Sequence, residues 1–322
     1  MAREAESGTF QVGVQFDTLT PAVLHRPAGP CVACGRTVST GRCTQCGTTR
    51  DAGRYRTVKV IGQRPFSRTY LAFDPKYDQH VVVKELWFAQ LPSVTELESF
   101  GREAALLSSV DHRRVPRLLK AFRLGDGPHL RLYLVREYVR GTSLATLARQ
   151  KPLDEPEARH VARQVLRVLR NLHAHRPPIV HRDLRPHHLL RRPSGNIHLL
   201  GFGAARWVEE GGTFDATLVG QPGYASFEQL GGTLDPGADL HGLGATLLHL
   251  ITGTDPFALM PDGRHLIVPR DLRVSPAFSS FLQRLLAPAY ERFASAHEAY
   301  EALTVQHRLA DALEWAAAWL RR

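Results

Sequence analysis

The character of the sequence pattern changes near residue 138. Before that point apolar and polar residues alternate, as in half-buried strands, over residues 54–62, 70–74, 80–86 and 130–139. A helical pattern at 93–110 interrupts them, with Leu97, Phe100, Ala104 and Leu107 on one face. After that point helical patterns dominate, at 155–176, 238–253, 276–287 and 295–303. We therefore predict an α+β chain with a small strand-rich lobe, carrying one helix, and a larger helical lobe.

Composition limits the class of protein but does not select a function. The chain has 322 residues, with 43% apolar and 22% charged side chains, which is typical of a globular protein. No apolar run approaches the roughly 20 residues of a membrane span, and the first residues lack a signal-peptide pattern. We expect a cytoplasmic location without a membrane span. The net charge of +10 is spread along the chain, so nucleic-acid binding is not favoured by charge alone.

All four cysteines lie between residues 31 and 46. They form two CxxC pairs, each followed by glycine: Cys31, Cys34, Cys43 and Cys46. Two such pairs can direct four thiolates at one zinc ion, and the glycines allow the tight turns. We predict a structural zinc site, because four thiolates leave no position for water. The alternatives are two disulfides or buried free thiols.

Several separated segments occur in an order that resembles the protein kinase fold. They run from "VIGQRPFSRTYLAFD" and "VVVKEL" through "IVHRDLRPHHLL" and "LLGFGAA" to "GQPGYASFEQL" and "ERFAS". With the four-cysteine prefix, the chain most resembles bacterial Ser/Thr kinases of the type common in cyanobacteria. The resemblance implies a bilobal protein-kinase-like fold preceded by a small zinc-ribbon-like knuckle of four cysteines.

The resemblance assigns catalytic positions to residues of both lobes. Lys84 would hold the α- and β-phosphates of ATP and pair with Glu103. Asp183 would accept the proton of a substrate hydroxyl, and Arg185 would keep a positive charge near the γ-phosphate. The implied nucleotide-contacting positions are Gly62, Arg64, Phe66, Thr69, Val82, Lys84, Glu137, Val139 and Leu190. Arg136, which precedes Glu137, could compete with Lys84 for Glu103.

The two positions that hold magnesium in this family are altered. His188 stands in place of an asparagine and Gly201 in place of an aspartate. Glycine offers no ligand, and imidazole is a poor ligand for a hard cation that prefers oxygen. Restoring an aspartate at position 201 would be expected to make ATP binding sensitive to magnesium. Glu209 and Glu210 are the nearby acidic residues that could compensate.

Other kinase positions are partly altered and partly retained. Only Gly62 survives from the glycine-rich loop, where Arg64 and Pro65 stiffen the turn. Gln221 replaces the threonine of the activation segment. Glu228 and Arg292 are placed to form an ion pair, and Asp239 to hold the backbone of the catalytic loop.

Three functions remain open. The first is a pseudokinase that acts as a scaffold or allosteric regulator in bacterial Ser/Thr phosphorylation signalling, with weak or metal-independent ATP binding. The second is a slow, atypical Ser/Thr kinase, and the third is a zinc-ribbon nucleic-acid-binding module. Zinc is the expected structural cofactor, ATP is a further candidate ligand and magnesium is doubtful; the expected partner or substrate is a protein. We expect a flexible leader at 1–28, the knuckle at 29–50, lobes at 55–138 and 139–304, and a C-terminal helix at 305–322.

Overall fold

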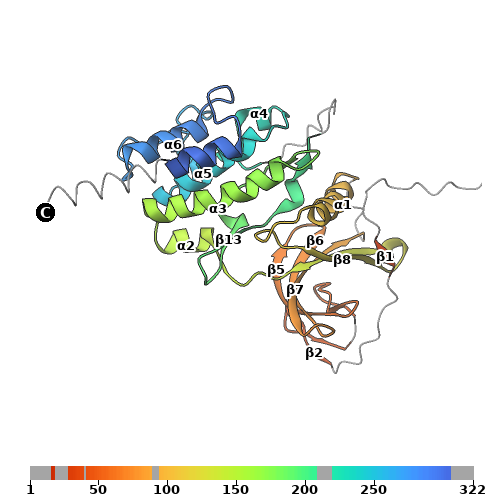
Figure 1. Cartoon of the computed structure of the whole chain (residues 1–322). Helices are drawn as coiled ribbons and strands as arrows, with labels where there is room; N and C mark the ends of the chain where they lie inside the picture. The colour runs from red at the N-terminus through yellow and green to blue at the C-terminus, as the bar shows by residue number, and fades with distance from the viewer. Residues whose placement is uncertain (1–15, 19–27, 40, 89–93, 209–219, 306–322) are drawn as a thin grey trace, which may run out of the picture. The chain divides into compact units, whose positions relative to one another are not determined.

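The computed structural model describes residues 16–18, 28–39, 41–88, 94–208 and 220–305 (Figure 1). These residues form two compact units. The first contains the residues up to Ser109 together with Arg117–Tyr138, and the second contains Val110–Pro116 and the residues from Val139 onward.

The first unit is built on a twisted sheet and one helix (Figure 1). The strand order is β1-β8-β9-β7-β6-β5-β4, antiparallel except for the parallel pair β1 and β8. The strands are β1 (Asp17–Thr18), β4 (Asp51–Ala52), β5 (Tyr55–Gln63), β6 (Ser67–Asp74), β7 (Gln79–Trp87), β8 (Leu118–Leu124) and β9 (Arg131–Glu137). Helix α1 (Val94–Ser109) belongs to this unit, as does the small hairpin of β2 (Gly29–Pro30) and β3 (Thr37–Val38).

The predicted alternation of β6 appears in its burial. Every second residue of this strand is buried, which places one face against an apolar cluster that includes Tyr55, Tyr70 and Phe122. The other face of the sheet meets α1 through Leu86, Phe100 and Ala104. The sheet is thus covered on both faces at β7, the strand that carries Lys84.

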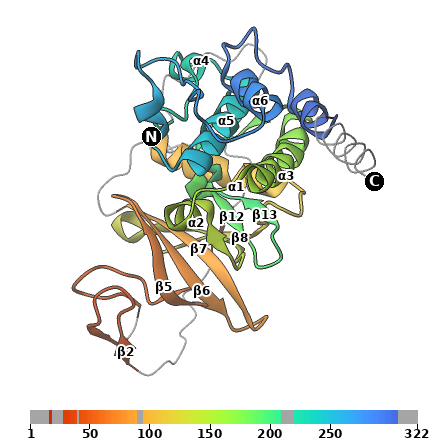
Figure 2. The ribbon, with the colours of Figure 1, turned by 90° about the vertical axis from the view of Figure 1, so that its left-hand side faces the viewer.

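The second unit is mainly helical (Figure 2). Its helices are α2 (Leu144–Gln150), α3 (Glu155–His173), α4 (Phe227–Leu230), α5 (Gly237–Thr252), α6 (Pro276–Leu286) and a helix over 296–305. Short strands pair as β10 (Thr142–Ser143) with β12 (Leu189–Arg191) and β13 (Ile197–Leu199), and as β11 (Ile179–Val180) with β14 (Arg206–Trp207). Short 3-10 turns cover Gly127–His129 in the first unit and Pro186–His188, Phe202–Ala204 and Pro256–Leu259 in the second.

The helices of the second unit follow from local sequence and from burial. Asp154 caps α3 in a capping box with Glu157, which fixes the start of the helix. Helix α5 is apolar on nearly all sides and is buried at most positions. A Cβ at Gly244 would lie 2.9 Å from Leu285 and Leu286, so glycine lets α5 and α6 approach closely.

Three residues near the N-terminus are part of the folded first unit. Residues 16–18, within the expected leader, are ordered: Phe16 stacks on Phe100, and β1 pairs with β8. The rest of the C-terminal helix expected after residue 305 lies outside the described residues. Among the residues that are described, no helix is both long enough and apolar enough to cross a bilayer.

Candidate functional site

Lys84 and Glu103 form an ion pair inside the first unit. Lys84 Nζ lies 2.5 Å from Glu103 Oε2, joining β7 to α1. Burial raises the pKa of Glu103, but the charges of Lys84 and then Arg136 outweigh it, so the net pKa is lowered. The structure therefore brings together the two residues that sequence analysis placed as partners.

Arg136 does not displace Lys84 from this pair. It lies on β9 beside Val82 of β7, and its Nη1 is buried without a hydrogen-bond partner among the described residues. Burial lowers the pKa of Arg136, while Glu103 partly offsets this effect. Glu103 is therefore paired with Lys84, and Arg136 is a second cation near it.

The turn between β5 and β6 replaces the glycine-rich loop. Arg64 N donates to Ser67 O at 2.8 Å, closing a tight turn around Pro65. Phe66 packs against the apolar cluster of Leu86 and Phe100. The phenyl ring is thus partly buried at the edge of the core of the unit.

The other residues expected to contact a nucleotide are divided between the two units. In the first unit Gly62 pairs with Thr69 across the hairpin, Val82 is buried on β7, and the Glu137 carboxylate accepts from Arg117 Nε at 2.7 Å. In the second unit Val139 and Leu190 are half-buried. Their roles stay predictions.

Asp239 of α5 holds the backbone at His181 and Arg182, in the segment 181–190 that corresponds to the catalytic loop of the family. Its carboxylate accepts from His181 N and from Arg182 N, both at 2.8 Å, and from His173 Nε2 at 3.0 Å. Arg182 has a left-handed φ of 65°, a conformation that costs energy and persists only when neighbours hold it. Gln229 adds such a hold, because its Nε2 donates to Arg182 O at 2.9 Å, a contact that sequence analysis missed.

Both carboxylate oxygens of Asp183 already have positively charged or polar neighbours. Oδ1 lies 3.0 Å from Arg185 Nε, and Oδ2 lies 3.4 Å from His188 Nδ1. His188 Nδ1 also lies 2.8 Å from the Asp183 carbonyl oxygen. Because a carbonyl only accepts, Nδ1 carries the proton and donates to it.

The ring of His188 fills the space next to Gly201. A Cβ built on Gly201 would lie 2.5 Å from Cγ of His188 and 2.6 Å from its Nδ1 and Cδ2. Gly201 also has a φ of 86°, which glycine tolerates better than other residues. Burial lowers the pKa of His188 to about 4, so the imidazole is neutral at pH 7. The absence of a side chain at Gly201 thus leaves the space that the imidazole of His188 occupies.

Positions 188 and 201 do not fit a magnesium ion. Mg²⁺ needs oxygen ligands in near-octahedral geometry, whereas this chain supplies one imidazole, already hydrogen-bonded to Asp183, and a glycine without a side chain. An aspartate at 201 would have to displace the His188 ring, because its Cβ would lie 2.5 Å from Cγ of His188, and its effect on the magnesium sensitivity of ATP binding stays a prediction. Glu209 and Glu210 lie outside the described residues.

Three further contacts lie within the second unit. Arg292 Nη1 lies 2.5 Å from Glu228 Oε1, as the sequence suggested. His181 and Phe202 meet edge to face with ring centroids 5.0 Å apart. The Gln221 carbonyl accepts from Tyr224 N at 3.0 Å in the turn that precedes α4.

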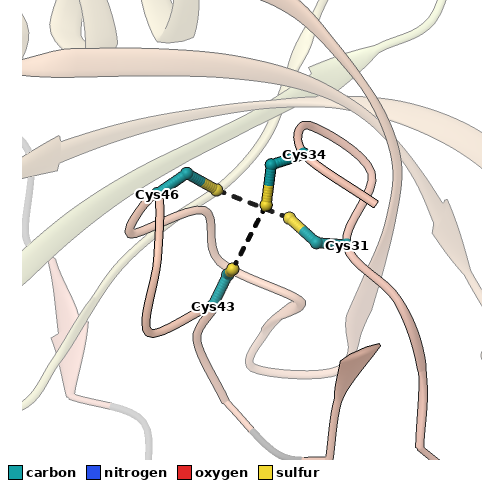
Figure 3. Close-up of side chains that lie close together, drawn as sticks. All are labelled: Cys31, Cys34, Cys43 and Cys46. Carbon is teal, nitrogen blue, oxygen red and sulfur yellow. Dashed lines mark hydrogen bonds between the residues drawn. The ribbon is translucent and has the colours of Figure 1, made fainter. Parts of the chain in front are cut away.

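The four cysteines converge in the first unit (Figure 3). Their Sγ atoms all lie within 4.8 Å of one another, with Cys31–Cys46 and Cys34–Cys43 each at 3.5 Å. In a tetrahedral zinc site with Zn–S bonds of about 2.3 Å the sulfurs are about 3.8 Å apart. Gly35 and Gly47 take φ of 76° and 68° and donate to Cys31 O and Cys43 O at 2.9 Å, so both knuckles repeat one turn. The donor set fits zinc.

The thiols also influence one another's protonation. Burial raises the pKa of Cys46, but hydrogen bonds from the side chain and backbone of Thr48 lower it to about 6. A hydrogen bond from Arg36 N lowers the pKa of Cys34, yet hydrogen bonding with Cys46 raises it to about 12. Neighbouring thiols therefore resist being ionised together, because their negative charges repel. A cation at their centre would offset that repulsion.

Glu85 connects this knuckle to the sheet, and sequence analysis missed it. Its carboxylate is fully buried and accepts from Arg42 Nη2 at 2.5 Å, Thr49 Oγ1 at 2.7 Å and the Tyr70 hydroxyl at 2.7 Å. Arg68 of β6 adds hydrogen bonds to Thr48 Oγ1 and Cys46 O. The available signal was a second charged residue directly after Lys84 in an otherwise apolar strand, where alternation turns it to the opposite face.

The fold and these paired residues define a protein of the kinase class. Residues 55–303 match the protein kinase domain family, and the chain belongs to that family. It is 34% identical over 269 residues to serine/threonine-protein kinase PknA of Nostoc sp., covering 78% of this chain and 47% of that protein. It is 35% identical over 211 residues to PrkC of Bacillus subtilis, covering 65% and 32%, respectively. For serine/threonine-protein kinase F of Synechocystis sp. the identity is 33% over 269 residues, covering 77% and 54%. The chain thus spans about half or less of the length of these relatives.

Proposed function

We propose that this protein is a pseudokinase that serves as a scaffold or allosteric regulator in bacterial Ser/Thr phosphorylation signalling. The observation that carries the proposal is the imidazole of His188, which occupies the space that a side chain at Gly201 would need. Magnesium normally bridges the β- and γ-phosphates and neutralises charge that develops during transfer. A chain without those ligands loses that stabilisation, so ATP binding would be weak or independent of metal.

The surroundings of Asp183 support the same proposal. A catalytic base must reach the substrate hydroxyl, and here Arg185 Nε lies 3.0 Å from Oδ1 of Asp183 and His188 Nδ1 lies 3.4 Å from Oδ2, so both side chains crowd the carboxylate. Arg185 is then engaged with the carboxylate that it would have to leave in order to approach a phosphate. Both effects reduce the rate of phosphoryl transfer.

A phosphorylation assay tests the proposal. The full chain is incubated with labelled ATP, magnesium or manganese, and a general protein substrate, beside the variant Asp183→Asn. We expect incorporation no higher than in Asp183→Asn. Magnesium-dependent incorporation that this substitution abolishes would overturn the pseudokinase assignment.

A slow Ser/Thr kinase is the second candidate. It is favoured by the Lys84–Glu103 ion pair at 2.5 Å and by the retention of Asp183, because an intact pair positions the phosphate-holding lysine. Its substrates would be protein hydroxyl groups. In the assay above this candidate predicts low but measurable incorporation that is lost in Asp183→Asn and in Lys84→Met.

We further propose that the four-cysteine knuckle holds one structural zinc ion. The converging thiols and the repeated turns support this proposal. A nucleic-acid-binding role has less support, because Arg42 donates to Glu85, and Arg50 donates to the carbonyls of Val38 and Ser39. Arg42 thus attaches the knuckle to the sheet, and Arg50 holds the knuckle together internally.

A further inference from the structure

A cavity of about 600 Å³ in the second unit has a strongly basic lining. It lies where the last turns of α3 meet the beginning of the helix over 296–305. Its polar lining residues are Arg167, Arg170, Asn171, His173, Ser295 and His297, and no carboxylate is among the residues that line it. The volume is in the range of sites for small molecules.

The two arginines of this cavity have no acidic partner within the described part of the chain. They contact the ring of Tyr300 instead, with the guanidinium carbons of Arg167 and Arg170 lying 5.5 and 4.9 Å from its centroid. Arg167 also donates to the Tyr300 hydroxyl at 3.0 Å. Burial, then Arg113 and Arg167, lower the pKa of nearby Arg114, which indicates an uncompensated positive field.

A simpler explanation covers only part of this arrangement. Cations in the last turn of a helix stabilise its negative end, and Tyr300 provides a favourable surface for both arginines. That explanation does not account for the helix N-terminus that also lines the cavity. The helix over 296–305 begins there, with Glu298 N donating to Ser295 Oγ at 3.1 Å and the Glu298 carboxylate, which does not line the cavity, accepting from Ala294 N at 2.7 Å. The positive end of a helix favours an anion.

His173 connects the cavity to the catalytic loop. Its side chain is nine-tenths buried, and its Nε2 lies 3.0 Å from Asp239 Oδ2. Its Nδ1 is buried and has no hydrogen-bond partner among the residues that the structure describes. The same Asp239 carboxylate accepts from the amides of His181 and Arg182. A group that contacts His173 therefore acts two hydrogen bonds away from those amides.

We propose that this cavity is a regulatory site for the phosphate group of a small phosphorylated molecule. Arg167 and Arg170 supply charge, the ring of His297 offers a hydrogen-bonding nitrogen, the helix N-terminus adds backbone dipoles, and Ala174 and Ala296 offer apolar surface to the body of the ligand. A dianionic phosphate next to His173 favours the doubly protonated ring, in which both nitrogens donate. The hydrogen bond to the Asp239 carboxylate then joins two oppositely charged groups, which strengthens it and tightens the hold of Asp239 on the amides of His181 and Arg182.

Binding is tested on the full zinc-loaded chain by calorimetric titration at constant ionic strength, with inorganic phosphate and glycerol 3-phosphate as probes. We expect saturable binding that weakens at least roughly tenfold in Arg167→Gln/Arg170→Gln, because two charge-assisted contacts are removed. The matched control is Arg192→Gln/Arg273→Gln, which removes the same charge from exposed positions of the same unit. Melting curves of each variant verify that it is folded.

The second readout is hydrogen exchange at the amides of His181 and Arg182. Phosphate should slow exchange there in the unmodified chain and in the control, but not in Arg167→Gln/Arg170→Gln. Absence of saturable binding, equal weakening in the control, or binding lost only in Lys84→Ala would overturn the site. Binding without altered exchange at these amides would overturn the link to the catalytic loop.

Discussion

At the scale of single residues, the informative feature is the pairing of His188 with Gly201. In the sequence, His188 and Gly201 read as the independent loss of two ligands of a metal site. In the structure the imidazole takes the space beside Gly201 and is held there by its hydrogen bond to the Asp183 carbonyl. A side chain at position 201 therefore cannot be introduced without moving or replacing His188.

A substitution series tests this coupling. Gly201→Asp should lower the melting temperature, since its Cβ forces the His188 ring out of place, at a cost of roughly 1–3 kcal/mol. His188→Asn/Gly201→Asp restores the combination typical of the family and should recover part of that loss, as well as magnesium-sensitive ATP binding. Differential scanning fluorimetry gives both quantities. Equal melting temperatures for Gly201→Asp and the unmodified chain would show that the ring moves freely.

Buried neutral histidines predict that stability falls in mild acid. Burial lowers the pKa of both His188 and His241 to about 4, whereas the unfolded chain takes up the proton near pH 6.5. Between these values the unfolded state binds more protons, so each histidine contributes a loss of about 1.4 kcal/mol per pH unit as pH falls.

The change is measured as the urea midpoint at pH 7, 6 and 5. His241→Asn keeps a donor for the Tyr224 carbonyl, which lies 3.3 Å from Nδ1 in the unmodified chain, and should reduce the slope. His129→Asn, at an exposed position, serves as control. An unchanged slope in His241→Asn would refute this origin of the acid sensitivity.

At the scale of elements, strand β7 serves two purposes through adjacent residues. Lys84 points to α1 and Glu103, and Glu85 points to the opposite face, where it binds Arg42 and Thr49 of the knuckle. The period of two in a strand makes this division possible. The knuckle is therefore anchored on the strand that also carries Lys84.

Neutralising Glu85 should weaken this anchor. Glu85→Gln leaves Arg42 and the half-buried Arg131 without the buried carboxylate that balances their charge. We expect a clearly lower melting temperature and faster loss of zinc to a chelator. Glu301→Gln, an exposed substitution of the same kind, should have no effect. Similar behaviour of the two variants would contradict the anchoring role.

Zinc itself is tested by metal analysis and removal. The chain purified without chelator under reducing conditions should contain about one zinc ion per molecule. Chelation should lower the melting temperature, because a structural site binds metal only when folded, and Cys43→Ser should reproduce that loss. A metal-free chain with unchanged melting behaviour would exclude a structural zinc site.

At the scale of the whole molecule, regular patterns were predictable and long-range contacts were not. The alternation in β6, the apolar run in β7 and the spacing of the cysteines follow from local geometry, so the sheet and the thiol cluster could be expected. The role of Glu85 depends on Arg42, 43 positions earlier in the chain, and on complete burial of the carboxylate. No local pattern encodes such a contact. The packing of His188 beside Gly201 likewise depends on a left-handed backbone that becomes visible only in three dimensions.

The central claim is that this kinase fold lacks a working magnesium site, and ATP binding measured with and without metal tests it most directly. The melting temperature of the full chain is recorded with ATP in EDTA, in magnesium and in manganese. The account predicts a small ATP-dependent increase that is the same in EDTA and magnesium, because positions 188 and 201 supply no oxygen ligand for the metal. A large increase that requires magnesium would contradict the account.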